Sequence, residues 1–228
     1  MSSLIIAIDG GAASGKSTVA RAVAARYELE YIDSGSFYRF ITYRLLEQRV
    51  QMEESAVLAI LPSIRFEFRG GKHHRKSRIL LRELRSPLVE SQVSFVAAIP
   101  AVREKVNEAL RQLVEGRRAA VEGRDIGTVV FPASSLKLFL VADLAVRNRR
   151  RVRQRRGLGL RAGEQEVQEN LRLRDRIDST RSIAPLMPAL DAVVIDTSRL
   201  SLDETLSQVF SLVEERLGSG QLTLCLLP

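Results

Sequence analysis

Residues 4–18 read LIIAIDGGAASGKST, and this stretch decides the fold. Its first part, 4–8, is a short apolar run rich in β-branched residues, which predicts a buried strand of a parallel sheet. The part that follows matches the phosphate-binding pattern G-x-x-x-x-G-K-[ST]. The next apolar residues, Val19, Val23 and Tyr27, have the spacing of one helix face. This order of strand, loop and helix is the context in which the pattern binds a nucleoside triphosphate.

The predicted loop carries three kinds of phosphate-binding group. Its glycines allow a tight turn that presents backbone N–H groups to phosphate oxygens, and the following helix adds its positive N-terminal dipole. Lys16 is long enough to reach the β- and γ-phosphates, and the hydroxyl of Ser17 can ligate Mg²⁺. The expected nucleotide-binding residues are Gly10, Gly11, Ala12, Ala13, Ser14, Gly15, Lys16, Ser17 and Thr18.

The rest of the chain alternates short apolar strands with amphipathic helices. The further strands are predicted at 30–32, 119–122, 136–141 and 192–195. This order predicts an α/β fold of the P-loop NTPase type in a single domain, with a five-stranded parallel sheet and helices on both faces. A period-two run at 64–68 and a partner strand at 77–81 predict a β-hairpin inserted into that order. Ser86 and Pro87 then predict the start of a helix.

Nearly all of the excess positive charge lies in one segment. The 228 residues include 35 Lys and Arg against 27 Asp and Glu, a net charge of +8. Residues 147–181 hold twelve arginines and five acids, a net +7, which leaves +1 for the remainder. Gly157 and Gly159 divide this segment into two predicted helices. Such a segment indicates a polyanionic partner, either a nucleic acid or the phosphates of small molecules.

The composition also excludes several classes of protein. No apolar run approaches the ~18 residues of a membrane span, and the first residues lack a signal-peptide pattern, so we expect a cytoplasmic protein. The single cysteine, Cys225, excludes an intrachain disulfide. The two histidines, His73 and His74, are adjacent and lie outside every motif, which argues against a catalytic triad or a histidine-based metal site.

Two further motifs combine arginine with aspartate. Arg124 and Asp125 follow a predicted strand, at the edge where parallel α/β sheets bind ligands. Arg174, Asp178 and Arg181 share one face of a predicted helix. Each set also has a plainer interpretation, a surface salt bridge or a solvated ion-pair ladder. A basic P-loop ATPase that acts on nucleic acid is the alternative from another class of protein.

Taken together, the motifs resemble those of bacterial cytidylate kinases, a family of nucleoside monophosphate kinases. The matches follow the family's order from residue 4 to about residue 215, and the most specific are GRDIGTVVFP at 123–132 and RDxxDSxRxxAPL at 174–186. The others are the phosphate loop, DSG at 33–35 with Tyr38 and Arg39, and LRS at 84–86. The resemblance implies phosphoryl transfer from ATP to CMP or dCMP, assisted by Mg²⁺ and without a general base. UMP or AMP is the alternative acceptor.

The resemblance also implies roles for individual residues. The monophosphate site is lined by Ser34, Tyr38, Arg39 and Arg124. The cytosine edge is recognised by Ser94, Arg103 and Asp125. Asp178, positioned by Arg174, holds the ribose, and Arg181 bridges toward the phosphates. The catalytic cations are Lys16, Arg124, Arg147, Arg150 and Arg181.

The family's organisation can be carried over as well. It implies a core at about 1–62, 100–146 and 182–217, a monophosphate-binding insert at about 63–99, an Arg-rich lid at about 147–181, and a tail at 218–228. It further implies a monomer that binds nucleotides and no specific nucleic acid. Two departures from the family's pattern are Gly11, where proline is common, and Glu122, where aspartate is common.

Overall fold

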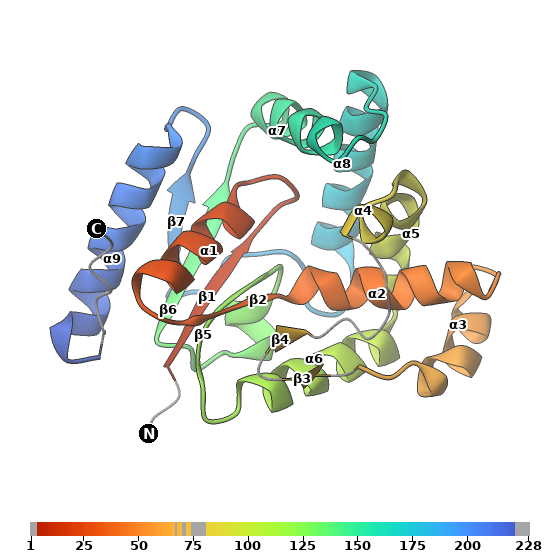
Figure 1. Cartoon of the computed structure of the whole chain (residues 1–228), viewed down its shortest axis with the longest axis horizontal. Coiled ribbons are helices and arrows are strands. Elements are labelled where there is room, and N and C mark those ends of the chain that lie inside the picture. The colour runs from red at the N-terminus through yellow and green to blue at the C-terminus, as the bar shows by residue number, and fades with distance from the viewer. Residues whose placement is uncertain (1–3, 67, 70–71, 74–80, 222–228) are drawn as a thin grey trace.

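The computed structural model contains a central parallel sheet, and it describes residues 4–66, 68–69, 72–73 and 81–221. The strands are β1 (Leu4–Gly10), β2 (Glu30–Asp33), β5 (Arg118–Gly123), β6 (Leu136–Val141) and β7 (Val193–Asp196). They pair in the order β2-β5-β1-β6-β7, and every pair is parallel (Figure 1). The predicted five-stranded parallel sheet is confirmed, with the phosphate-loop strand at its centre.

Helices cover both faces of this sheet because side chains alternate along each strand. Ile6 and Ile8 of β1 pack with α1 (Lys16–Arg26) and α9 (Leu202–Gln221). Ala7 faces the opposite way, into a second core with α2 (Ser34–Glu47), α3 (Glu54–Ile60), η1 (Leu61–Ser63), α5 (Pro87–Ala98) and α6 (Pro100–Val114). α6 ends at Val114, and Gly116, which takes a φ of +67°, turns the chain into β5.

The predicted hairpin is present, but its strands lie elsewhere. They are β3 (Phe68–Arg69) and β4 (Lys72–His73), paired antiparallel. Residues 64–66 are not in a strand, because Ile64 is buried in the core and the Phe66 ring packs 5.0 Å from that of Phe37 on α2. The alternation of Ile64 and Phe66 therefore comes from packing in the helical core and not from a paired strand. The predicted partner strand is also wrong at Leu81, which begins α4 (Leu81–Leu84), and the rest of it lies outside the described residues.

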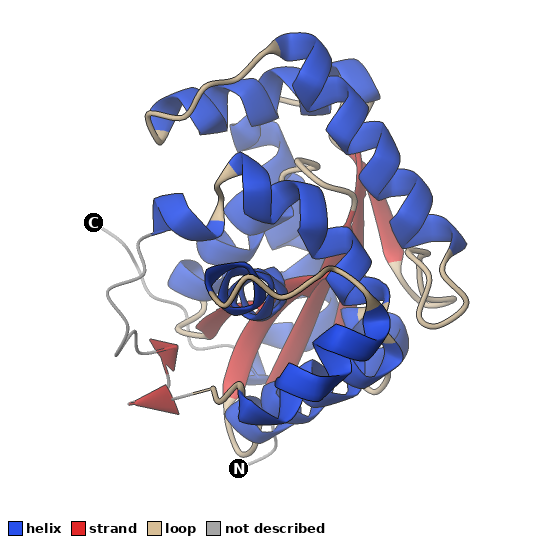
Figure 2. Ribbon diagram, turned by 90° about the vertical axis from the view of Figure 1, so that its right-hand side faces the viewer, coloured by secondary structure: helices blue, strands red, loops and turns tan. Residues whose placement is uncertain are grey.

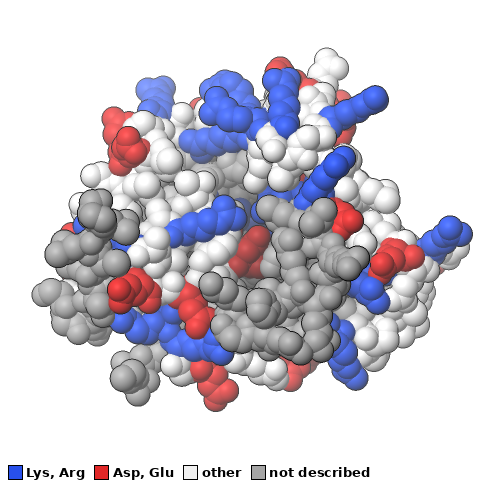
Figure 3. All heavy atoms as spheres, in the orientation of Figure 1, with Lys and Arg blue, Asp and Glu red and all other residues white. Residues whose placement is uncertain are grey.

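The arginine-rich segment forms two helices, α7 (Leu144–Gly157) and α8 (Glu164–Thr180). A small apolar cluster of Ala12, Val152, Val167 and Leu171 joins both helices to the phosphate loop. α7 consequently lies above the carboxyl ends of the strands (Figure 2), and Lys and Arg side chains gather along that upper edge of the molecule (Figure 3). Among the described helices, none combines the length and apolar character that crossing a membrane would require.

Candidate active site

The phosphate loop takes the sharp path that its glycines permit. Gly15 has a φ of +103° and caps the start of α1, which leaves the first N–H groups of that helix facing the loop. Gly10 has a φ of +149°, and a Cβ atom there would lie 2.3 Å from the carbonyl oxygen of Leu140. Both positions need glycine, the first for backbone conformation and the second also for the close approach of β6.

Lys16 lies within this loop as a buried cation. Its side chain is 8% exposed, and its ammonium group donates to the carbonyl oxygen of Gly11 at 2.9 Å. Burial, reinforced by the charge of Arg124, lowers the pKa of Lys16 well below its usual value. A desolvated ammonium group beside other cations gains more from an added anion than an exposed lysine would.

A cavity of about 540 Å³ lies over the loop, and we call it the donor cavity. Its floor is residues 12–18, and its other side is formed by α7 and the start of α9. Arg150 lines it and is fixed by hydrogen bonds to the carbonyl oxygens of Ser14, at 3.2 Å, and Thr197, at 2.8 Å. Arg147 lies beside the loop but not in the lining, because its guanidinium donates to Ala12 and pairs with Asp175 of α8 at 2.7 Å.

Ser17, the expected Mg²⁺ ligand, lies beside a buried carboxylate. Its hydroxyl donates to Glu122 at 2.8 Å, and Tyr31 donates to the other oxygen of that carboxylate at 2.5 Å. Glu122 is 2% exposed at the end of β5, so its charge is held next to the loop. Hydroxyl and carboxylate oxygens suit Mg²⁺, which keeps several waters and phosphate ligands. Among the described residues, no three or more His, Cys, Asp or Glu side chains are grouped so that they could hold a metal ion.

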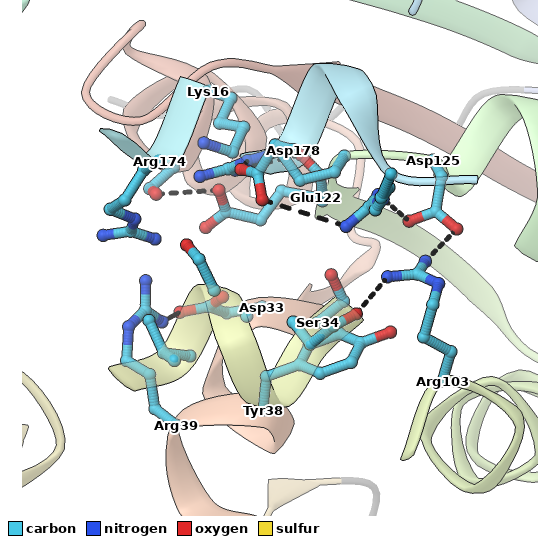
Figure 4. A pocket seen from close by; sticks show the side chains of 18 residues that line it. Lys16, Asp33, Ser34, Tyr38, Arg39, Arg103, Glu122, Asp125, Arg174 and Asp178 are labelled. Carbon is cyan, nitrogen blue, oxygen red and sulfur yellow. Dashed lines mark hydrogen bonds and ion pairs between the residues drawn. The ribbon is translucent and has the colours of Figure 1, made fainter. Parts of the chain in front are cut away.

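A second cavity, which we call the acceptor cavity, lies between α2, α5, α8 and the end of β5 (Figure 4). All ten side chains that the family resemblance assigns to the acceptor nucleotide line it: Ser34, Tyr38, Arg39, Ser94, Arg103, Arg124, Asp125, Arg174, Asp178 and Arg181. Six segments of the chain contribute to this lining, and the structure brings them together around about 70 Å³.

The acceptor cavity contains guanidinium groups paired with carboxylates. Arg124 donates to Asp178 at 2.9 Å, Arg103 pairs with Asp125, and Arg181 lies 3.8 Å from Asp125 and from Asp178. Burial raises the pKa of Asp178, but the charges of Arg124, Arg174 and Arg181 outweigh this and hold it below its usual value. Both plainer interpretations from the sequence are wrong, because Asp125 and Asp178 are 4% and 5% exposed and lie on no solvated face.

Several arginine N–H groups in this cavity have no hydrogen-bond partner among the described residues. They are Nε and Nη1 of Arg174, Nε of Arg39, Nε of Arg103 and Nη2 of Arg181. Arg174 is buried, and burial lowers its pKa to about 10. Buried donors that the protein itself leaves without acceptors favour an anionic ligand, since each costs free energy until it is paired.

The two cavities meet along a shared wall. Lys16, Ser17, Arg39 and Arg124 line both of them. Three of these four side chains are cationic, and they come from α1, α2 and the end of β5. A phosphoryl group passing from one cavity to the other would therefore cross a region of concentrated positive charge.

Three charged residues near the site received no role from the sequence: Asp9, Asp33 and Arg85. Asp33 caps α2 and pairs with Arg39 at 3.4 Å and Arg85 at 3.6 Å, which orients Arg39. Asp9 of β1 accepts hydrogen bonds from the backbone of Ile126 at 2.9 Å and Gly127 at 2.8 Å, directly after Arg124 and Asp125. Asp33 belongs to the DSG motif and Arg85 to the LRS motif, and Asp9 directly precedes the phosphate loop. Their closeness to these motifs could have identified all three as residues of the site.

The fold and the site define a P-loop enzyme of the phosphoryl-transferring class, in which a nucleotide loop faces a separate pocket for an acceptor. The family model described as cytidylate kinase matches residues 6–215. The chain therefore belongs to the cytidylate kinase family, and it is an ATP-dependent kinase that phosphorylates CMP or dCMP.

Individual relatives agree with this membership. A cytidylate kinase from Geobacillus kaustophilus is 40% identical over 221 residues, which cover 93% of this chain and 97% of the relative. One from Acholeplasma laidlawii is 35% identical over 218 residues, covering 96% and 98%. An uncharacterised protein of known structure from Eubacterium ventriosum shares the fold at 12% identity, with a TM-score of 0.51 and coverage of 93% and 99%.

Proposed function

We propose that this chain transfers the γ-phosphoryl group of ATP in line to CMP or dCMP across the wall that the two cavities share. The observation that carries this mechanism is the lining of both cavities by Lys16, Ser17, Arg39 and Arg124. A phosphate oxygen of CMP attacks the γ-phosphorus, and the bond from that phosphorus to the β–γ bridging oxygen breaks to leave ADP. Charge stabilisation and positioning supply the catalysis.

No general base is required in this mechanism. The attacking phosphate oxygen is already ionised near neutral pH, because the second pKa of a phosphate monoester is about 6. Lys16, Arg124 and Arg181 neutralise the oxygens of the group in transit, and Arg150 holds the donor phosphates from the side of α7. The guanidinium of Arg147 pairs with the carboxylate of Asp175 in this structure. Arg147 would act in catalysis only after leaving Asp175 to bind a phosphate.

The acceptor is recognised by the groups assigned from the family. Ser94, Arg103 and Asp125 line the cavity and would meet the cytosine edge, whereas Asp178, positioned by Arg174, would hold the ribose. Arg39 and Arg124, with Ser34 and Tyr38, would surround the monophosphate. The Nε–H group of Arg39, which has no hydrogen-bond partner among the described residues, supports an anion at this position.

We also propose Mg²⁺ at Ser17, with Glu122 beside it. The metal would supply charge neutralisation on the donor phosphates. Closure of α7 and α8 over the donor cavity would exclude water and so prevent wasteful hydrolysis. The division into core, insert and lid, a cytoplasmic location, a monomeric state and the lack of a specific nucleic-acid partner remain proposals of the same kind.

One assay tests the acceptor directly. ADP release is measured with ATP, Mg²⁺ and each of CMP, dCMP, UMP, AMP and GMP. We expect ADP formation that depends on the acceptor and saturates with CMP and dCMP. A preference for AMP or UMP would overturn the choice of substrate, and acceptor-independent ATPase activity stimulated by RNA would favour the nucleic-acid alternative.

A further inference from the structure

Glu90 is a buried carboxylate between the acceptor side and the arginine-rich helices. It lies on α5 and is 1% exposed. Arg155 of α7 donates to its Oε2 from Nε at 3.1 Å and from Nη2 at 2.9 Å. Arg151, one turn earlier on α7, places Nη1 3.3 Å from its Oε1. One carboxylate of α5 therefore holds two arginines of α7.

The charge of Glu90 is maintained by these neighbours. Burial raises its pKa, but the charges of Arg151, Arg174 and Arg155 outweigh the effect and keep it below the usual value. Arg151 is itself buried, and this lowers its pKa to about 9. A buried ion pair of this kind is costly to break, because either partner alone would remain desolvated and uncompensated.

Glu90 connects the two cavities although it lines neither of them. Ser94 lies one turn further along α5, on the same face as Glu90, and lines the acceptor cavity. Arg151 lines the donor cavity. α5 packs against α8, and α8 against α7, so these elements form one continuous contact (Figure 1). A displacement of α5 by an acceptor at Ser94 would move the partner of a donor-site arginine.

We propose that Glu90 is a positioning residue that couples the two substrates: it holds Arg151 in the donor cavity through α5, so that binding of CMP and binding of ATP favour each other. This inference rests on the proposed function. Coupling between sites is reciprocal and requires an element that both ligands bias, and the Glu90, Arg151 and Arg155 cluster is that element.

The test measures the coupling itself. The Kd of a non-hydrolysable ATP analogue is determined by calorimetry with and without saturating CMP, for the unaltered enzyme and for Glu90→Gln. We expect CMP to tighten analogue binding by about fivefold or more, the lower end for coupled sites. Glu90→Gln should lose most of that factor while binding CMP alone as the unaltered enzyme does.

Two further variants separate positioning from general stability. Arg155→Met removes a partner of Glu90 that lines neither cavity, and it should also lose the coupling. Glu166→Gln is the matched control, because Glu166 pairs with the same Arg155 at 2.8 Å but its side chain is 61% exposed. It should retain the coupling. If Glu90→Gln does not fold, Arg155→Met carries the test.

Different outcomes would contradict the proposed kinase function and the coupling role of Glu90. An unaltered enzyme that forms no ADP with CMP would contradict the proposed function. Suppose instead that the enzyme is active but binds the ATP analogue equally well with and without CMP, or that the coupling persists in both Glu90→Gln and Arg155→Met. Either result would overturn the role of Glu90 and leave the proposed function in place.

Discussion

The donor and acceptor cavities are built in opposite ways. The floor of the donor cavity is one uninterrupted stretch, residues 12–18, and Arg150 above it is held by backbone carbonyl oxygens. The acceptor cavity draws its side chains from segments far apart in the chain, and its arginines Arg124 and Arg103 are held by Asp178 and Asp125. The first depends on a local motif, and the second depends on tertiary contacts.

This difference has a physical basis. Backbone N–H groups and a helix terminus bind any phosphate, so a short loop is sufficient for the donor. An acceptor must be selected by its sugar and base as well, which requires polar groups of both signs at several points around it. In the proposed mechanism the carboxylates of the acceptor cavity would provide that selection, and they also compensate for the buried arginines.

Lys16→Ala should have the largest effect, because Lys16 belongs to both cavities. We expect kcat to fall by about 1000-fold, the upper range for loss of one preorganised donor to the transition state. Steady-state ADP formation measures this, and a thermal melt provides the control for folding. A kcat within about tenfold of the unaltered value would mean that the lysine only closes the loop through Gly11.

Asp9→Asn tests the buried carboxyl group that binds the backbone N–H groups of Ile126 and Gly127. Burial raises the pKa of Asp9 from 3.8 to about 6, so between these values the folded state binds more protons than the unfolded state. The contribution of Asp9 to stability therefore falls as the pH rises through this window, and asparagine removes the dependence. We expect the free energy of unfolding of Asp9→Asn, relative to the unaltered protein, to rise by about 2.4 kcal/mol from pH ~4 to pH ~7. Urea denaturation at both pH values measures it, and a constant difference would contradict the prediction.

Asp178→Ala should weaken the acceptor side alone. The substitution removes the carboxylate that accepts from Arg124 and, in the proposed mechanism, from the ribose. We expect the binding free energy of CMP to weaken by about 2 kcal/mol, which raises the KM for CMP about 30-fold. The KM for ATP should change little. Asp175→Asn is the control, because Asp175 lies on the same helix and pairs with Arg147 beside the phosphate loop. If the KM for CMP is unchanged in Asp178→Ala, the aspartate has only a structural role.

Ser94→Ala should have the smallest effect. Loss of one neutral hydrogen bond to the base is worth about 1 kcal/mol, or about fivefold in the KM for CMP. Ser91 of the same helix is exposed and bonds to Leu88, so Ser91→Ala should leave that KM unchanged. Equal effects of the two substitutions would remove Ser94 from the recognition of the acceptor.

Sequence reasoning predicted the sheet and named ten residues that line the acceptor cavity, but through different routes. The strands could be recognised from local hydrophobic runs, whereas residues such as Ser94 and Arg103 were found only through the resemblance to a family. The prediction misplaced the hairpin because it took Phe66 for part of a paired strand. The ring of Phe66 instead packs against that of Phe37. Glu90 carried no signal at all, since nothing near it in the chain indicates two arginines about sixty residues away.

The sequence by itself determined the nucleotide loop and the parallel sheet around it, because both depend on residues that are adjacent in the chain. It also located the charge, with +7 of the +8 in residues 147–181. Only the tertiary structure decided what that charge does: Arg150 and Arg151 face the donor cavity, Arg174 and Arg181 face the acceptor cavity, and Arg155 is neutralised by Glu90. The reason is that the electrostatic role of an arginine depends on burial and on its partners, and the partners come from distant segments.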